Sequence, residues 1–283
     1  MQAATRAIQR PRDAKLLVID ESQGQIHAPR TAFTDFLSAG DLVIANDAAT
    51  LPASLHGVHQ PTSEPIEVRL AGRASLRSDD LRFTAIAFGR GDFHTRTEER
   101  PLPPTLHRGD RLLLGSLVAT IEAVLDHPRL VSLVFAGEPH AIWAGLATDG
   151  RPIQYAHVPE ALELWDVWTP FASVPAAFEP PSAGFALDWS QLRRMHARGI
   201  QFATITHAAG ISSTGDERLD ARLPFHRVHV LNFNPEGICA VLTRYGAICG
   251  ISSNSTFIAT DFAGMVEPNC KGCGRARCHL PRR

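Results

Sequence analysis

The chain has 283 residues, of which 44% are hydrophobic and 20% charged, and its formal net charge is −1. This composition is typical of a globular protein with a sizeable core and excludes a disordered chain. It also excludes a global basic field for nucleic acid, so any RNA binding has to use a local patch. No apolar run approaches the ~18 residues of a membrane span, and residues 1–15 contain no apolar signal segment, so we expect a cytoplasmic protein with no membrane partner.

The first fifty residues predict an α/β arrangement. Residues 16–19 form a short apolar run typical of a strand, residues 34–37 predict a short helix, and residues 42–45 form a second buried strand that ends at Asn46. Open α/β sheets bind ligands beyond the carboxyl ends of such strands. Asn46 and Asp47 are therefore candidate site residues, with a turn-forming Asx pair as the alternative.

From about residue 55 to residue 137 the sequence changes to short β-rich runs separated by turns. These runs are residues 66–70, 81–88, 111–114, 117–124 and 130–135. Many short strands with regular turns are typical of a small β-barrel or sandwich. Because this module lies between two α/β segments, we predict an α/β main domain with an inserted small β-barrel domain. The main domain takes residues 1–54 and 150–283, and the inserted domain takes residues 55–149.

Regular structure returns after a stretch rich in Pro, Trp and Ala at residues 150–181. Asp188 is a good N-cap for a helix over residues 189–198, and Gly199 fits the C′ position behind it. Residues 200–206 then predict a strand that ends at His207. This second strand delivers polar residues from its carboxyl end.

The densest polar stretch of the chain follows at residues 206–220. Its functional side chains are those of His207, Ser212, Ser213, Thr214, Asp216 and Asp220. A histidine at a strand end can serve as a general acid or base near neutral pH. The alternative is a polar loop with a capping aspartate and a surface histidine. The chain contains no G-x-S-x-G elbow, dinucleotide fingerprint or P-loop.

Several motifs resemble the S-adenosylmethionine:tRNA ribosyltransferase-isomerases of queuosine biosynthesis. The family pattern G-D-L-L-V-x-N-N-T-R-V-I-P-A-R-L is similar to residues 40–55, and its I-E-V is similar to residues 66–68. The family's A-P-T-A-G-L-H-F is similar to residues 180–187, which include a small-residue turn before a helix. Its T-L-H-V-G strand end is similar to residues 205–209. The motifs agree in order and spacing over about residues 15–225.

The resemblance implies an enzyme of tRNA modification that acts on the anticodon region. Such enzymes transfer the ribosyl part of S-adenosylmethionine to a 7-aminomethyl-7-deazaguanine base in tRNA and isomerise it, which gives epoxyqueuosine. S-adenosylmethionine is the co-substrate, and no prosthetic group or metal is implied. The chemistry needs a base for the proton beside the sulfonium, a donor for departing adenine and a pocket for the flipped base.

The resemblance also implies roles for the polar side chains. His207 and Asp216 are the candidate catalytic residues, with His207 in proton transfer. Carboxylates that would favour the sulfonium charge are those of Asp47, Glu67, Asp216 and Asp220. Further candidate substrate contacts are Asn46, Ser182, Ala183, Gly184, Ser212, Ser213 and Thr214.

The chain differs from the family pattern at positions that the resemblance implies contact the substrate. The family's N-N-T-R is Asn46-Asp47-Ala48-Ala49 here, and Ala186 stands at the family's histidine. The alternative function is therefore a non-catalytic or substrate-shifted relative that binds RNA or a nucleotide. We expect a monomer in either case.

Residues 226–283 form a tail with a composition of its own. All five cysteines of the chain lie there, at Cys239, Cys249, Cys270, Cys273 and Cys278. Three interpretations are open: a zinc-binding appendage, scattered core cysteines of a native segment, or a reading frame that shifts near Phe225. We favour the last, under which the main sheet would lack strands, and we expect no metal site because a structural zinc needs four ligands.

Overall fold

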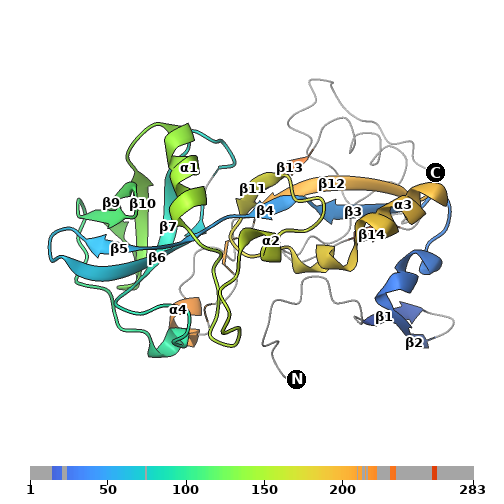
Figure 1. Ribbon diagram of the computed structural model, residues 1–283, viewed down its shortest axis with the longest axis horizontal. Helices are drawn as coiled ribbons and strands as arrows, with labels where there is room; N and C mark the ends of the chain where they lie inside the picture. Colours follow the sequence, from blue (N-terminus) through green and yellow to red (C-terminus); the bar gives the residue numbers. More distant parts are fainter. Residues whose placement is uncertain are drawn as a thin grey trace, which may run out of the picture.

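The computed structural model describes residues 15–20, 24–73, 75–208, 210–211, 214, 216–221, 230–233 and 257–259. A closed barrel of six strands lies at one end of the molecule, and a four-stranded mixed sheet lies beside it (Figure 1). The predicted fold class, α/β with a β-barrel, is confirmed. Within the described ranges, no helix has both the length and the apolar character that a membrane span requires.

The barrel is antiparallel throughout. Its strands are β5 (Ser54–His59), β6 (Glu64–Gly72), β7 (Arg82–Phe88), β8 (Arg111–Leu114), β9 (Leu117–Val124) and β10 (Leu130–Phe135), in the order β10-β7-β6-β5-β8-β9. Five of them were predicted from their apolar runs. The sequence prediction missed β5, because two histidines and a glycine interrupt its apolar residues.

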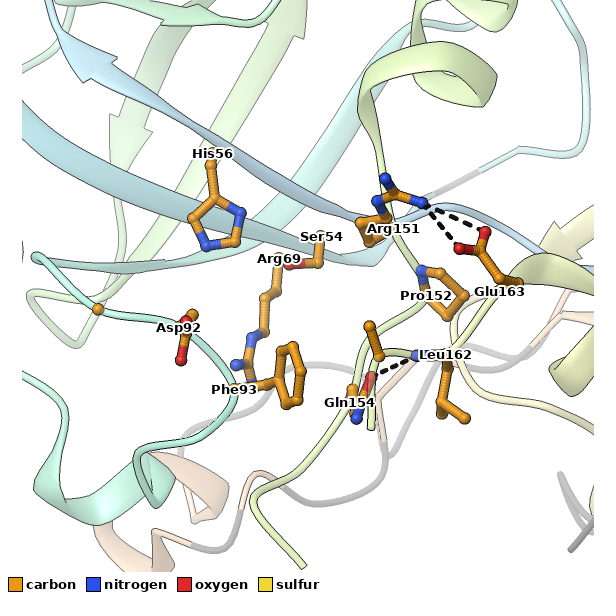
Figure 2. A pocket seen from close by; sticks show the side chains of 12 residues that line it. Ser54, His56, Arg69, Asp92, Phe93, Arg151, Pro152, Gln154, Leu162 and Glu163 are labelled. Atoms are coloured by element: carbon orange, nitrogen blue, oxygen red, sulfur yellow. Dashed lines mark hydrogen bonds and ion pairs between the residues drawn. The ribbon is translucent and has the colours of Figure 1, made fainter. Parts of the chain in front are cut away.

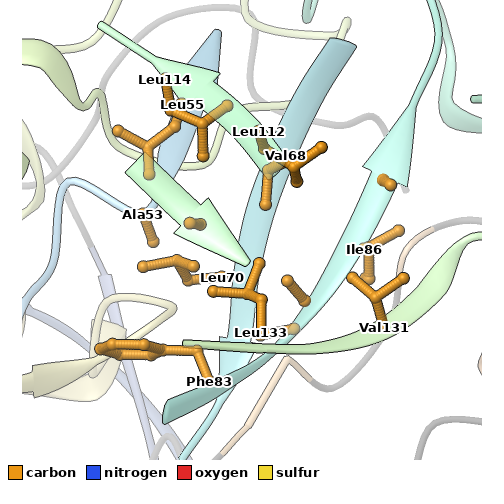
Figure 3. Packing of buried hydrophobic residues seen from close by; sticks show 14 of the residues in the cluster. Ala53, Leu55, Val68, Leu70, Phe83, Ile86, Leu112, Leu114, Val131 and Leu133 are labelled. Atoms are coloured by element: carbon orange, nitrogen blue, oxygen red, sulfur yellow. The ribbon is translucent and has the colours of Figure 1, made fainter. Parts of the chain in front are cut away.

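The barrel interior is filled with apolar side chains and is not a channel (Figure 3). On β6, Ile66, Val68 and Leu70 are at most 2% exposed and belong to this core. Alternate residues of a strand point to opposite faces, so Glu67 and Arg69 stand on the outer face of β6. Helix α1 (Pro139–Asp149), which the sequence prediction missed, packs against β5 and β9.

The main sheet is built around two parallel strands, β3 (Leu42–Asn46) and β12 (Gln201–Ala208). Both were predicted. Two antiparallel strands flank them, β13 (Val230–Phe233) beside β12 and β14 (Phe257–Ala259) beside β3. These two strands come from the tail that the sequence analysis set apart. The sheet therefore has edge strands at these two positions, where a shifted reading frame was expected to leave none. The five cysteines lie outside the described residues. The zinc and frame-shift interpretations depend on that part of the tail and stay predictions.

Smaller elements complete the fold. They are the hairpin β1 (Lys15–Asp20) and β2 (Gly24–Pro29), the parallel pair β4 (Ala48–Thr50) and β11 (Val174–Ala177), the helices α2 (Leu164–Val167), α3 (Trp189–Ala197) and α4 (Glu217–Asp220), and the 3₁₀ helices η1 (Arg30–Phe36), η2 (Thr97–Glu99) and η3 (Ser182–Ala186). The short helix predicted over residues 34–37 is a 3₁₀ helix and ends one residue earlier.

Helix α3 has the boundaries that its end signals predict. The Asp188 side chain accepts a hydrogen bond from the Gln191 backbone N–H at 2.9 Å, which satisfies a free donor of the first turn. Gly199 has a φ of +71°, the left-handed conformation expected at the C′ position. The two predicted end signals are confirmed.

The chain enters and leaves the barrel at neighbouring points. Ser54 and Arg151 hydrogen bond to each other through both backbone groups at 2.9 Å. An inserted module has this geometry when its two connections run together. The predicted domain limits at residues 54/55 and 149/150 lie at this crossing, and they remain a proposal.

Candidate functional site

The carboxyl ends of β3 and β12 point towards the barrel (Figure 1). The parallel register pairs Asn46 with Ile205, so the residues that follow both strands emerge at the same edge. Asn46 and Asp47 therefore meet His207 there, although His207 is far from them in the sequence. This edge is where open α/β sheets place ligands.

Asn46 holds the end of β12 in place. Its side-chain Oδ1 accepts hydrogen bonds from the backbone N–H of His207 at 3.0 Å and of Ala48 at 3.1 Å. Its Nδ2 donates to the His207 carbonyl at 2.9 Å. The amide thus continues the hydrogen bonding between the two strands beyond their last paired residues, Asn46 and Ile205. Its main effect is to fix the backbone of His207.

Asp47 and His207 lie on either side of this clamp. The Thr206 hydroxyl donates to Asp47 Oδ1 at 2.7 Å, and Asp47 remains partly exposed. Because successive side chains alternate along a strand, His207 points to the opposite face from Thr206. His207 is 2% exposed. A buried imidazole on a fixed backbone is well placed for proton transfer only if the ligand reaches that face.

Glu67 is the centre of a second polar cluster, on the outer face of the barrel. It is 1% exposed, and its Oε1 accepts from Ser54 Oγ at 2.9 Å and from Arg69 Nε at 2.6 Å. Arg100 donates to its Oε2. Burial opposes the charged form, but Arg69 and Arg100 outweigh it and hold the pKa of Glu67 below its ordinary value. One carboxylate faces two guanidinium groups, so its negative charge is already compensated.

Three buried arginines surround one aromatic ring in this cluster. The guanidinium carbons of Arg69, Arg100 and Arg129 lie 4.9, 5.0 and 5.0 Å from the ring centroid of Phe88, within cation–π range. Burial lowers the pKa of Arg129, and nearby Asp216 opposes this shift. Asp216, a predicted catalytic residue, therefore lies near the arginine cluster of the barrel.

The polar loop after β12 docks on the barrel. The Ile211 backbone N–H donates to the Ala71 carbonyl at 2.9 Å. The Thr214 hydroxyl donates to Asp220 Oδ1 at 2.6 Å, and Asp216 Oδ1 caps α4 by accepting from the backbone N–H groups of its first turn. The predicted Thr214, Asp216 and Asp220 are therefore brought together. Ser212 and Ser213 lie outside the described residues.

Tyr155 links this loop with the barrel cluster. Its hydroxyl donates to Glu179 Oε1 at 3.1 Å. Burial and the negative charge of Glu179 raise the pKa of Tyr155, Arg69 lowers it, and Asp220 raises it further. These electrostatic interactions place Arg69 and Asp220 close to the same phenol. Tyr155 therefore stays protonated and can serve as a hydrogen-bond donor.

A cavity of about 490 Å³ opens beside the Glu67 cluster, between β5, β6 and the segments 91–93 and 151–163 (Figure 2). This volume is in the range of small-molecule sites. Its walls include Ser54, His56, Arg69, Asp92, Phe93 and Gln154. At one side, an exposed ion pair between Arg151 and Glu163, with an N–O distance of 3.2 Å, closes the rim.

The turn at Ser182, Ala183 and Gly184 lies in η3 and forms a separate place. Ser182 is exposed, Ala183 is partly buried and Gly184 is buried. A Cβ atom at Gly184 would approach side-chain atoms of Phe171 and Thr169 at 2.8 and 2.9 Å, so packing requires glycine here. Among the described residues, no hydrogen bond joins this turn to Asn46, His207 or Glu67. Its predicted substrate contacts remain a proposal.

The sequence prediction missed the three arginines of the barrel cluster. Arg69 could have been inferred from the alternation on β6, which places it beside Glu67 on the outer face. Arg100 and Arg129 lie in connecting segments, where no periodic signal marks them. In the part of the chain that the structure describes, no group of three or more His, Cys, Asp or Glu side chains could hold a metal ion.

The chain is similar to proteins of queuosine biosynthesis. The family model for "Queuosine biosynthesis protein" matches residues 1–230. An S-adenosylmethionine:tRNA ribosyltransferase-isomerase of Anaeromyxobacter sp. is 27% identical over 237 residues, which cover 82% of this chain and 64% of that protein. The Dichelobacter nodosus protein of the same name is 28% identical, with coverage of 78% and 58%. The chain thus spans about three fifths of the length of these relatives.

A solved structure gives a similar picture of coverage. The crystal structure of an S-adenosylmethionine tRNA ribosyltransferase from Thermotoga maritima matches 72% of this chain and 55% of its own chain. The sequence identity is 17%, and the TM-score is 0.27. The family assignment therefore rests on the sequence comparisons, which confirm the resemblance inferred from the motifs.

Proposed function

The chain belongs to the queuosine biosynthesis protein family, and on this premise we propose that it is an S-adenosylmethionine-dependent tRNA ribosyltransferase-isomerase. It would transfer the ribosyl group of S-adenosylmethionine to a 7-aminomethyl-7-deazaguanine base in the anticodon region of tRNA and isomerise it, giving epoxyqueuosine. Its partners would be tRNA and S-adenosylmethionine, with no prosthetic group. We further propose that it acts in the cytoplasm as a monomer.

The observation that carries the proposal is the polar edge where β3 and β12 end facing the barrel. Asn46 fixes the backbone of His207 with two hydrogen bonds, and Asp47 stands at the same edge with a hydroxyl partner. An enzyme that removes a proton beside a sulfonium needs a positioned base and a nearby negative charge. This edge supplies both residue types on a rigid parallel pair.

We assign proton removal from the carbon beside the sulfonium to His207. Asp47 is partly exposed at the same strand ends, on the face opposite to His207, and a ligand that lies across these strand ends reaches both side chains. We assign to Asp47 the negative charge that favours the sulfonium cation. Asp216 remains the second candidate catalytic residue, for the departing adenine. Because two arginines already compensate Glu67, we assign it to holding those arginines and not to the sulfonium. Asn46 acts as a positioning residue through the backbone of His207.

A second candidate function follows from the family positions that differ. Ala49 stands where the family pattern has an arginine, and Ala186 stands at its histidine. Ala49 is 7% exposed and lies in β4, paired with β11, and its methyl group cannot form the contacts of an arginine. A relative that binds RNA or a nucleotide without catalysis would tolerate these changes.

Adenine release separates the two functions. The purified full chain is incubated with S-adenosylmethionine and tRNA that carries the 7-aminomethyl-7-deazaguanine base, and free adenine is followed by chromatography. We expect adenine release that depends on this tRNA, and its loss in His207→Ala. The matched control is His140→Ala, because His140 is an exposed residue of α1. A folded protein that releases no adenine above background would refute the enzyme function, and an active His207→Ala variant would refute the role of that residue.

A further inference from the structure

The cavity on the outer face of the barrel contains a buried cation with unused donors. Arg69 is 4% exposed, and its Nε donates to Glu67. Among the described residues, no hydrogen-bond acceptor is found for its two terminal nitrogens. Figure 2 shows the side chain leaving β6 towards the segment that carries Asp92 and Phe93. A guanidinium with both terminal nitrogens open is suited to bidentate binding of an oxyanion.

The rest of the cavity wall offers complementary chemistry. His56 is half exposed, and its Nε2 lies 3.8 Å from Glu67 Oε2, so the imidazole stands beside the same cationic group. Phe93 presents a partly exposed aromatic ring. Aromatic side chains in such grooves stack on nucleobases. The cavity therefore combines an oxyanion site with a stacking surface.

Asp92 adds a negative charge to the same cavity. Its Oδ1 accepts from the backbone N–H and from the ring nitrogen of His94, both at 2.9 Å. The backbone N–H bond lowers the pKa of Asp92, so the carboxyl group is ionised at neutral pH. A carboxylate opposes a bare phosphate ion but accepts hydrogen bonds from the amino group of a base. A ligand with an oxyanion at one end and an amino-bearing aromatic ring at the other satisfies all of these groups.

We propose that this barrel cavity is a nucleotide-binding subsite, in which Arg69 and His56 bind the phosphate, Phe93 stacks on the base and Asp92 accepts from its amino group. The subsite gives the near-neutral chain the local cationic patch that RNA binding requires. Only the identification of the nucleotide as part of an RNA rests on the proposed function. An amino acid also carries an oxyanion and an amine, but it would leave Phe93 and most of the 490 Å³ unused.

Binding of guanosine 5′-monophosphate and of guanosine to the full chain, followed by calorimetry, tests the subsite. We expect Phe93→Ala to weaken binding of the nucleotide at least about fivefold, the lower end for loss of one base stack. Arg69→Lys keeps a positive charge beside Glu67 but loses the planar fork, so we expect about a tenfold loss. His56→Gln should weaken the nucleotide more than the nucleoside. The control is Arg82→Gln, because Arg82 is 69% exposed and pairs with Glu122 elsewhere on the barrel.

The nucleoside provides a second, ligand-side test. In the wild-type chain we expect guanosine to bind about tenfold more weakly than its monophosphate, and we expect this difference to shrink in Arg69→Lys, in which only His56 and an ammonium group still face the phosphate. Binding unchanged in both Phe93→Ala and His56→Gln would overturn the proposal. So would equal binding of guanosine and its monophosphate, displacement of the nucleotide by methionine, or no binding at millimolar concentration.

The binding experiment and the adenine-release assay can fail independently of each other. Adenine release is measured on the same preparations. Nucleotide binding without adenine release would refute the enzyme function and leave the subsite standing. Adenine release with no binding at the cavity would refute the subsite and leave the enzyme function standing.

Discussion

Replacing Glu67 by glutamine should destabilise the protein more than any exposed charge change on the barrel. Glu67→Gln keeps the shape of the side chain and removes its charge. The carboxylate accepts from Ser54, Arg69 and Arg100, and the two arginines are only 4% and 3% exposed. In the variant one oxygen becomes an NH2 group that faces a guanidinium donor. Breaking such a buried pair costs roughly 3–5 kcal/mol.

The matched control is Glu122→Gln, on the same barrel. Glu122 pairs with Arg82 Nε at 3.0 Å, but their side chains are 32% and 69% exposed. An exposed pair contributes less than about 1 kcal/mol because solvent screens it. Urea unfolding at neutral pH measures both variants against the wild type. A Glu67→Gln variant whose free energy of unfolding lies within about 1 kcal/mol of the wild type would show that the buried ion pairs contribute no more than an exposed one.

The pH dependence provides an independent check of the same ion pair. The folded-state pKa of Glu67 lies below its ordinary value, so its contribution to stability is fully present above the unfolded pKa. The contribution is lost as the pH falls through the folded pKa. The stability gap between wild type and Glu67→Gln should therefore be constant from neutral pH down to the ordinary glutamate pKa and shrink below it. A gap that widens on acidification would show that another group dominates.

Three further substitutions test other parts of the structure. Asp188→Ala removes the N-cap of α3 and should cost about 1 kcal/mol in urea unfolding, whereas no loss would contradict the capping role. Gly184→Ala places a Cβ within 2.8 Å of a neighbouring ring, and we expect about 1–3 kcal/mol of destabilisation by overpacking, measured by thermal unfolding, with an unchanged melting temperature as the refuting result. Asn46→Ala should leave the chain folded but lower the rate of adenine release at least about tenfold, because the side chain no longer holds the backbone of His207. Asn46→Asp keeps the acceptor oxygen and should lose less activity. Equal activity of Asn46→Ala and the wild type would contradict the positioning role.

Much of the fold could be predicted from the sequence because local patterns determine it. The end signals of α3, Asp188 and Gly199, act within one turn of the helix and were predicted correctly. The β-barrel strands have apolar runs bounded by turns, which identify them without knowledge of their partners. Strand β5 has no such run, and it is recognised only by its pairing with β6 and β8. Its position depends on tertiary contacts that the sequence pattern does not contain.

The site was less predictable than the fold, because its groups come from separate elements. The sequence placed Asn46 and His207 at the ends of two predicted strands. The parallel pairing of these strands then brings the two residues to the same edge of the sheet. Glu67 was inferred as a carboxylate for the substrate, but the structure pairs it with Arg69 of the same strand and with Arg100 of a distant segment. Arg100 lies in a proline-flanked connection where nothing in the local pattern indicates burial. Charge compensation of this kind becomes visible only when the chain is folded.

The proposed ribosyl transfer is tested most directly by following the ribosyl group itself. S-adenosylmethionine labelled with radioactive carbon in the ribose is incubated with the full chain and with tRNA that carries the 7-aminomethyl-7-deazaguanine base. The label in precipitated RNA and the free adenine are then measured in the same reaction. We expect RNA-bound label and released adenine in equal amounts. Adenine release without label in the RNA, or no release from a folded protein, would contradict it.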